Sequence, residues 1–186
     1  MLDVQRTHLP EVLVLKPHVF GDERGFFVES WNQKRFDDAV GEPVRFVQDN
    51  HSHSSHGVVR GLHYQLPPAA QGKLVRVASG RIWDVAVDLR RSSPRLGQWS
   101  GVEVSAANGL QLWIPPGFAH GFLTLSDSAD VLYKSTVFYS PAHERTLLWN
   151  DPRVAIDWPL AELRWAVTVS ARDAAAPPWK TCEFFD

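Results

Sequence analysis

The sequence is poor in the features that mark secreted, membrane or nucleic-acid-binding proteins. Its 186 residues include one cysteine, Cys182, which excludes an internal disulfide framework and is typical of a reducing compartment. The formal net charge of −2 provides no basic surface for nucleic acid or a membrane. The apolar run "VLVL" is too short for a signal peptide, and no stretch approaches a membrane span. We therefore expect a cytoplasmic protein with neither a nucleic-acid nor a membrane partner.

Apolar and aromatic residues, by contrast, are plentiful. Hydrophobic residues make up 44% of the chain and charged residues 22%, as in ordinary globular proteins. Eight tryptophans predict aromatic-lined walls as well as an apolar core. Because no repeat, linker or low-complexity stretch interrupts the chain, we expect one domain over residues 1–186.

Short β-rich runs cut by glycine and proline turns predict an all-β sandwich or jelly-roll barrel. The run "RIWDVAVDL" at 81–89 is the clearest strand. One face of this strand carries Trp83, Val85, Val87 and Leu89, and the other carries Ile82, Asp84, Ala86 and Asp88. The pairs Ser79-Gly80 and Asn108-Gly109 predict hairpin turns between neighbouring strands.

Two further segments complete the predicted elements. The run "VLYKSTVFY" at 131–139 predicts a strand that is long enough to place Tyr133 and Tyr139 on one face. Only "NQKRFDDAV" at 32–40 predicts a helix, with Asn32 as its N-cap. The run "EVLVLKPHVF" at 11–20 is a candidate strand for exchange between two subunits.

Four of the eight histidines lie close together, three in "HSHSSHG" at 51–57 and one, His63, in "GVVRGLHYQ". His51 and His53 have the spacing with which a metal-binding cupin motif begins. The acid that such a motif needs four or five positions later is absent, because Gly57 and Val58 stand there. We therefore expect a polar loop at 51–57 and no metal site. His63 lies among apolar residues in a predicted strand, either as a hydrogen-bonded core residue or as a functional one.

Five long blocks of the sequence resemble one enzyme family. They are "VFGDERGFFVESWN", "FVQDNHSHSSHGVVRGLHYQ", "QGKLVRVASGRIWDVAVDLR", "LWIPPGFAHGFLTLSDSADVLYK" and "FYSPAHERTLLWNDP". From about Leu9 to Pro159 the chain is similar to the dTDP-4-dehydrorhamnose 3,5-epimerases, with a weaker likeness in "SARDAAAP". The resemblance implies a cupin-type jelly-roll (double-stranded β-helix) barrel with a few short helices. It also implies a homodimer that works without metal or cofactor.

The implied reaction inverts C3 and C5 of dTDP-4-dehydro-6-deoxy-D-glucose on the route to L-rhamnose. The C4 ketone acidifies both C–H bonds, so inversion needs a base on one face and an acid on the other. The resemblance assigns the base to His63, its orienting partner to Asp173, the acid to Tyr133 and the enolate-side cation to Lys73. Imidazole is mostly neutral at pH 7 and phenol is protonated there, which suits these roles.

The same resemblance implies a set of residues that hold the substrate. Arginines bind diphosphate bidentately, and Tyr139 matches an aromatic that stacks on thymine. His120 matches a second donor in the pocket. The implied substrate-binding residues are Arg24, Glu29, Gln48, Asp49, Asn50, Arg60, Lys73, His120, Tyr139, Glu144 and Arg172.

Two departures from the family pattern bear on these assignments. Arg172 stands where the family often has lysine, which keeps the charge but changes the geometry. The stretch "PLAELRWAVTV" after Trp158 is longer and more apolar than usual, which alters the register on which Asp173 is assigned. With these assignments, "HSHSSHG" is interpreted as lining the approach to a metal-free site in which only His63 moves protons.

Other functions remain open from the residues alone. A metal-dependent cupin oxygenase or isomerase would use His51, His53 and His120, and stoichiometric metal in the purified protein would identify it. A non-catalytic cupin that binds sugar nucleotides would exchange no substrate protons. Within the family, related enzymes invert only C5 or act on other dTDP-ketosugars, and the sequence does not separate these.

Overall fold

The computed structural model describes residues 2–186. Strands dominate it and the helices are short, as the sequence predicted. The strands are β1 (Leu2–Arg6), β2 (Leu13–Pro17), β3 (Val19–Asp22), β4 (Gly25–Val28), β5 (Gln48–Ser55), β6 (Val58–Gln65), β7 (Lys73–Ser79), β8 (Arg81–Asp88), β9 (Trp99–Ser105), β10 (Gln111–Ile114), β11 (Phe118–Thr124), β12 (Ser128–Ser135), β13 (Glu144–Thr146) and β14 (Thr168–Val169). The helices are α1 (Gln33–Val40), the 3-10 turn η1 (Leu160–Glu162) and α2 (Ala171–Ala174). Within residues 2–186 no helix has the length and apolar character needed to cross a membrane.

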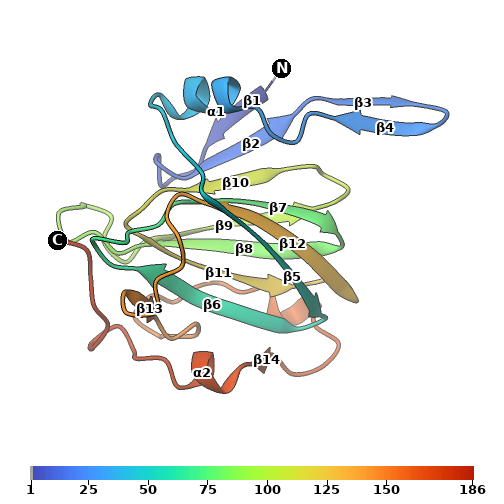
Figure 1. Ribbon diagram of the computed structural model, residues 1–186. Coiled ribbons are helices and arrows are strands. Elements are labelled where there is room, and N and C mark those ends of the chain that lie inside the picture. The colour runs from blue at the N-terminus through green and yellow to red at the C-terminus, as the bar shows by residue number, and fades with distance from the viewer. Residues whose placement is uncertain (1) are drawn as a thin grey trace.

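Two sheets form the body of the molecule (Figure 1). The first has the strand order β1-β2-β10-β7-β12-β5. The second has the order β13-β6-β11-β8-β9, with β14 running parallel to β6. Strands with one apolar face pack as two facing sheets because each sheet can bury that face only against another layer.

The core between the sheets comes from the inner faces of both. On β8, Ile82 and Ala86 belong to this core, whereas Val85 and Val87 pack on the opposite face. The two faces predicted for this strand are therefore confirmed. Asp84 is fully buried on the inner face. A buried carboxylate needs a partner, so its position among apolar side chains marks a specialised part of the core.

The C-terminal part of the chain covers the outer face of the second sheet. This layer buries apolar residues of β6, β8 and β11 against later segments. Its members include Val59, Leu62, Tyr64, Val85, Val87, Leu123, Leu147, Trp158, Cys182 and Phe185. Helix α2 and strand β14 consequently lie against β6 (Figure 1), which is where the catalytic histidine is expected.

Helix α1 closes the outer face of the first sheet. Its Phe36 is 2% exposed and packs with Leu13, Leu15 and Trp113. The side chain of Asn32 accepts a hydrogen bond from the Arg35 amide at 3.1 Å, so the predicted helix and its N-cap are confirmed.

The hairpin formed by β3 and β4 projects away from the two sheets (Figure 1). Its aromatic side chains find little cover within the chain. Phe20 is 58% exposed, Phe26 75% and Phe27 68%. Neighbouring exposed aromatics of this kind mark a contact surface. We call residues 19–28 the arm.

The two predicted hairpins are wrong, although both turns exist. Ser79-Gly80 links β7 in the first sheet to β8 in the second. Asn108-Gly109 likewise links β9 in the second sheet to β10 in the first. Turn residues specify that the chain reverses, but the partner of each strand is decided by which faces bury together.

The polar loop expected at 51–57 is mostly strand. Residues 48–55 form β5, which pairs along its whole length with β12 at the edge of the first sheet. Its side chains alternate between the interior and solvent, with Asn50 and Ser54 directed inward and His51 and His53 outward. The alternating Ser and His residues therefore reflect an edge strand with one wet face.

Candidate active site

His63 and Asp173 form a hydrogen-bonded pair at the edge of the second sheet. Nε2 of His63 lies 2.7 Å from Oδ1 of Asp173, and the other oxygen of Asp173 accepts the Gly61 amide at 3.2 Å. The His63 side chain is 30% exposed, whereas the Asp173 side chain is 5% exposed. Burial raises the pKa of Asp173, but the hydrogen bond from His63, the attraction of that ring and the bonds from Gly61 and Ser170 together hold this pKa below its usual value. The carboxylate therefore fixes the ring, and Nδ1 is left as the basic atom.

Two glycines, Gly61 and Gly121, let strands β6 and β11 approach closely beside His63. A Cβ on Gly61 would lie 2.6 Å from Cα of Gly121, and a Cβ on Gly121 would lie 2.7 Å from the Arg60 carbonyl oxygen. Strands β6 and β11 thus approach more closely here than side chains permit. The register also shifts beside this contact, between His120 and Phe122. This irregularity turns His63 inward while Leu62 stays in the outer layer.

A second histidine–aspartate pair lies directly beside the first. His120 is opposite His63 in the sheet register, and its Nε2 is 2.6 Å from Oδ1 of Asp84. Burial lowers the pKa of His120, and Asp84 opposes this effect. Asp84 has no role among the residues predicted from the sequence. The signal was available, since Asp84 alternates with the apolar Ile82 and Ala86 on one face of the predicted strand.

Lys73 begins β7 and crosses between the two sheets. Its Nζ lies 3.4 Å from the carbonyl oxygen of His63, and the residue is 9% exposed. Burial lowers the pKa of Lys73 to about 8, against the attraction of Asp84 and Glu144. Near neutral pH this lysine is therefore still a cation, held in a poorly solvated place where a charge acts strongly.

Tyr133 approaches the same interior from the first sheet. It packs against the core between the sheets and is paired in register with Asn50 on β5. Burial raises the pKa of Tyr133, with Arg60 opposing and Glu144 adding to the effect. The phenol consequently holds its proton at neutral pH. Neighbouring Gln48 donates to Asn50 at 2.9 Å, so both amides border this space.

A polar cluster stands at the rim of the site. Glu144 on β13 accepts hydrogen bonds from Tyr139 at 2.5 Å and from Arg172 at 2.7 Å. Burial raises the pKa of Glu144, but the bonds from Arg172 and Tyr139 and the attraction of Arg172 and His63 together leave this pKa below its usual value. Strand β12 ends at Ser135, so the prediction that one strand carries Tyr133 and Tyr139 is wrong. Arg172, which directly precedes Asp173 in the chain, pairs with Glu144 at this rim.

Arg60 on β6 contacts the neighbouring strand β5. Its Nε donates to Ser54 at 2.9 Å, and its Nη2 donates to the carbonyl of His53 at 3.1 Å. Because Arg60 opposes the pKa rise of Tyr133, its positive charge acts on the same interior.

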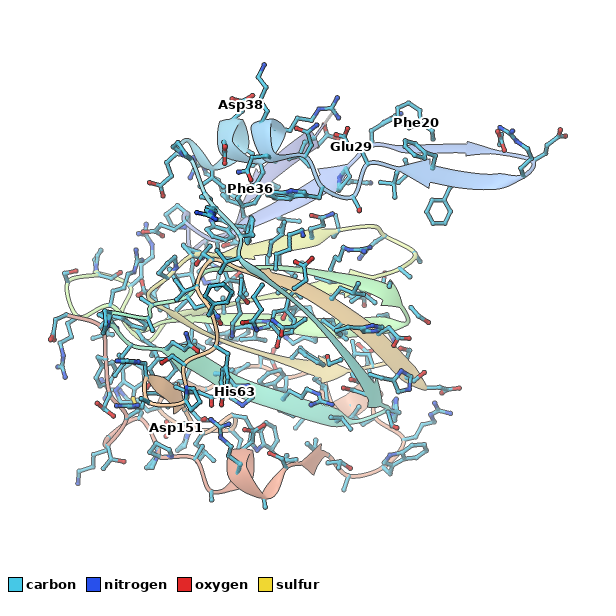
Figure 2. All side chains as sticks on the ribbon, in the orientation of Figure 1. Phe20, Glu29, Phe36, Asp38, His63 and Asp151 are labelled. Atoms are coloured by element: carbon cyan, nitrogen blue, oxygen red, sulfur yellow. The ribbon has the colours of Figure 1, made fainter. Side chains whose placement is uncertain are left out.

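Three of the predicted substrate-binding residues do not join this group within one chain. Arg24 is at the tip of the arm and pairs with Asp22 at 2.5 Å. Glu29 pairs with Arg35 at 2.8 Å, and Figure 2 shows it beside the arm, well apart from His63. Asp49 faces outward from β5 and pairs with Lys134 at 2.9 Å.

The other histidines of "HSHSSHG" do not line the approach to the site, so that interpretation is wrong. His51 and His53 both contact Oδ1 of Asp130 at 3.0 Å on the outer face of the first sheet. His56 is buried at the turn between β5 and β6 and bonds to backbone groups. Across residues 2–186, no group of three or more His, Cys, Asp or Glu side chains has an arrangement suited to a metal ion.

The groups of the site lie close enough to act on one another electrostatically, as the His63–His120 register pair and the 3.4 Å contact of Lys73 Nζ with the His63 carbonyl indicate. Glu144 acts on His63, Lys73 and Tyr133, and His120 feels both His63 and Lys73. A base, a protonated phenol and a cation around one space can remove a proton from carbon, hold the anion and return a proton. The fold and the site thus define a class of protein: acid–base enzymes that work on a C–H acid between two β-sheets.

Comparison with known proteins narrows this class. The family model described as dTDP-4-dehydrorhamnose 3,5-epimerase matches residues 6–181. The chain belongs to this family. It is 57% identical over 177 residues to the dTDP-4-dehydrorhamnose 3,5-epimerase of Salmonella typhimurium, and the matched region covers 95% of each chain.

Solved structures agree with the fold. The dTDP-6-deoxy-D-glucose-3,5-epimerase of Legionella pneumophila, in complex with dTDP-4-keto-L-rhamnose, is 49% identical with a TM-score of 0.90, covering 95% of this chain and 92% of that one. A 3'-monoepimerase from Streptomyces bikiniensis, in complex with dTDP-quinovose, is 30% identical with a TM-score of 0.88, covering 95% of this chain and 88% of that one.

Proposed function

We propose that the protein inverts C3 and C5 of dTDP-4-dehydro-6-deoxy-D-glucose and so forms dTDP-4-dehydro-L-rhamnose for L-rhamnose biosynthesis. The observation that carries the proposal is the His63–Asp173 contact of 2.7 Å beside a buried Lys73 and a protonated Tyr133. The family membership supports the substrate, because the similar Legionella enzyme holds dTDP-4-keto-L-rhamnose.

The first half of the reaction is proton removal. Nδ1 of His63 takes the proton from carbon, and the electrons of that C–H bond move toward the C4 carbonyl to form an enolate. Asp173 stabilises the imidazolium, as carboxylates do in other His–Asp pairs. Lys73 and His120 stabilise the negative oxygen of the enolate, with Asp84 fixing the ring of His120.

The second half is proton return to the opposite face. Tyr133 gives its phenolic proton to the carbon, and the enolate electrons form the new C–H bond. The raised pKa of Tyr133 keeps that proton in place at neutral pH. Solvent then takes the extra proton from His63 and returns one to Tyr133. The same groups can therefore serve C3 and C5 in turn, because both carbons are adjacent to the C4 ketone.

The nucleotide half of the substrate lies toward the rim. Arg60 and Arg172 supply cations for the diphosphate, and Tyr139 supplies an aromatic face for thymine. Glu144 holds Arg172 and Tyr139 in place in the unliganded protein. The other polar residues assigned to the substrate are Gln48, Asn50 and His120, and Asp49, also assigned by resemblance, faces away from this site within one chain.

The protein acts as a homodimer in this proposal, with the arm of one chain completing the site of the other. Arg24 and Glu29 are matched to the substrate by resemblance, yet Arg24 pairs with Asp22 on the projecting arm and Glu29 lies away from His63 in one chain (Figure 2). The arm that carries Arg24 also exposes three phenylalanines. A two-fold exchange of arms buries these rings and brings both charged residues to a site.

The fold, the absence of a metal or cofactor and the cellular location complete the proposal. The repeated crossing of the chain between the two sheets supports a cupin-type jelly roll, formed as one domain over residues 1–186. The site works on its own side chains, without metal or cofactor. A buried, unpaired Cys182 supports a cytoplasmic location.

The test is NMR of the ketosugar nucleotide with purified protein in deuterated water. The expected result is deuterium at both C3 and C5 and the appearance of the L-configured product. Deuterium at one carbon alone would replace the proposal with a single-site epimerase. No exchange at either carbon, with nucleotide bound, would identify a binding protein and contradict the proposal.

A further inference from the structure

The segment that leads into Asp173 is docked against the turn between β5 and β6. The Thr168 amide donates to the Gly57 carbonyl at 2.9 Å, and β14 then runs beside the start of β6. Immediately afterwards, Ser170 caps α2 by accepting the Asp173 amide at 3.1 Å. The position of Asp173 therefore depends on how residues 163–169 sit on this turn. We call these residues the docking segment.

His56 is the side chain that receives the docking segment. It is 4% exposed, and its Nδ1 lies 3.0 Å from the Leu125 carbonyl and 3.2 Å from the Ser126 carbonyl. Its Nε2 lies 3.1 Å from the backbone nitrogen of Arg164. The ring of Trp165 packs edge-on against it at 4.9 Å.

These partners fix the protonation state of the ring. Carbonyl oxygens only accept, so Nδ1 of His56 must carry the hydrogen. A backbone amide only donates, so Nε2 must present a lone pair to Arg164. The docked arrangement is therefore specific to neutral imidazole. A proton on Nε2 would face the amide hydrogen of Arg164, and that amide would lose its acceptor.

The charged groups around His56 are already paired. The guanidinium of Arg164 pairs with Asp127, whose backbone carbonyl accepts the His56 amide at 2.8 Å. Arg81, which contacts the adjacent Ser126, pairs with Glu162 at 3.0 Å. Neither carboxylate contacts the imidazole in the docked state.

We propose that His56 is a positioning residue for catalysis: its neutral ring docks the Arg164 backbone and thereby sets Asp173 against His63. The inference rests on the proposed function only through the role of Asp173.

Hydrogen exchange of the backbone amides over residues 160–172 tests the docking step, independently of activity. Wild type, His56→Leu and His56→Gln are compared at one pH, with intrinsic exchange corrected. Glutamine keeps one donor and one acceptor, whereas leucine has neither. We expect His56→Leu to exchange about tenfold faster than wild type, as when one hydrogen bond is lost. His56→Gln should stay as protected as wild type.

Turnover tests the positioning step. His56→Leu should lower kcat about tenfold while KM stays within about twofold, and His56→Gln should restore kcat. Asp127→Asn removes the side-chain partner of Arg164 but leaves the His56 contacts, so it should retain wild-type exchange and kcat. If His56→Leu does not fold, His56→Ala, which also lacks an acceptor for the Arg164 amide, takes its place in both measurements.

Several results would overturn the proposal. They are wild-type protection of the docking segment in His56→Leu, the same loosening in Asp127→Asn, and a loosened segment with unchanged kcat. Absence of epimerisation by wild type would instead remove the proposed function, and the exchange results would still show whether His56 docks the segment.

Discussion

At the scale of single residues, the burial of Lys73 supports its role as the cation that stabilises the enolate. A lysine at the start of a strand is usually solvated, so the sequence position alone did not indicate this role. The Lys73 pKa of about 8 means that the cation is present below this pH and lost as the pH rises through it. Enolate stabilisation needs the cation, so we expect kcat to fall with an alkaline limb near pH 8. Lys73→Met should lower kcat about 10²–10³-fold, and the remaining activity should lack this limb. A limb near pH 8 that persists in Lys73→Met would assign it to another group.

The outward histidines give a second prediction at this scale. His51 and His53 share one oxygen of Asp130 and lie on the opposite side of the sheet from the proposed reaction. Dialysis against a strong chelator should therefore leave turnover unchanged, as should His51→Ala combined with His53→Ala. Loss of activity that one divalent ion restores would contradict the metal-free mechanism.

At the scale of elements, the close approach of β6 and β11 sets the geometry of both histidine pairs. A Cβ added at Gly121 would meet the Arg60 carbonyl oxygen and the Leu62 side chain at 2.7 and 2.8 Å. Gly121→Ala should therefore force the strands apart and lower the free energy of unfolding by about 2 kcal/mol. Gly121→Ala should also lower kcat, because His63 and His120 form the cross-strand pair next to this contact. Denaturant unfolding and steady-state kinetics measure the two effects, and wild-type values for both would contradict this account.

The elements also show where the sequence is informative and where it is not. The alternation in 81–89 and the cap at Asn32 are local patterns, and both predicted the observed structure. The turns at Gly80 and Gly109 were recognised, but their strands pair elsewhere, because pairing depends on burial across the whole sandwich. Asp173 could be matched only by resemblance, since its contact with His63 joins residues 110 positions apart. Asp84 was missed because a polar residue on an inner face has no assigned partner until the strands are placed.

At the scale of the whole molecule, the arm accounts for the residues that one chain leaves outside the site. Light scattering should give about twice the chain mass of 20.9 kDa at micromolar concentration. A monomer mass would contradict the exchange of arms.

Subunit mixing tests whether the arm completes the partner's site. Arg24→Ala and His63→Ala should each be poorly active alone. A mixture in equal amounts that exchanges subunits should regain activity at about a quarter of its sites, since each mixed dimer holds one intact site. Mixtures no more active than the separate variants would confine Arg24 to its own chain, away from the chemistry.

The central claim is that His63 and Tyr133 carry protons on opposite faces of the sugar. The most direct measurement is NMR of the substrate in deuterated water with His63→Ala and Tyr133→Phe. In His63→Ala no proton leaves carbon, so both exchange and inversion should be lost. In Tyr133→Phe the base still removes a proton and returns deuterium to the same face, which gives deuterated substrate of unchanged configuration. Inversion by Tyr133→Phe should be roughly 10²–10⁴-fold slower than in wild type, as expected for the loss of one positioned acid. Inversion at the wild-type rate in Tyr133→Phe, or rapid exchange in His63→Ala, would contradict the account.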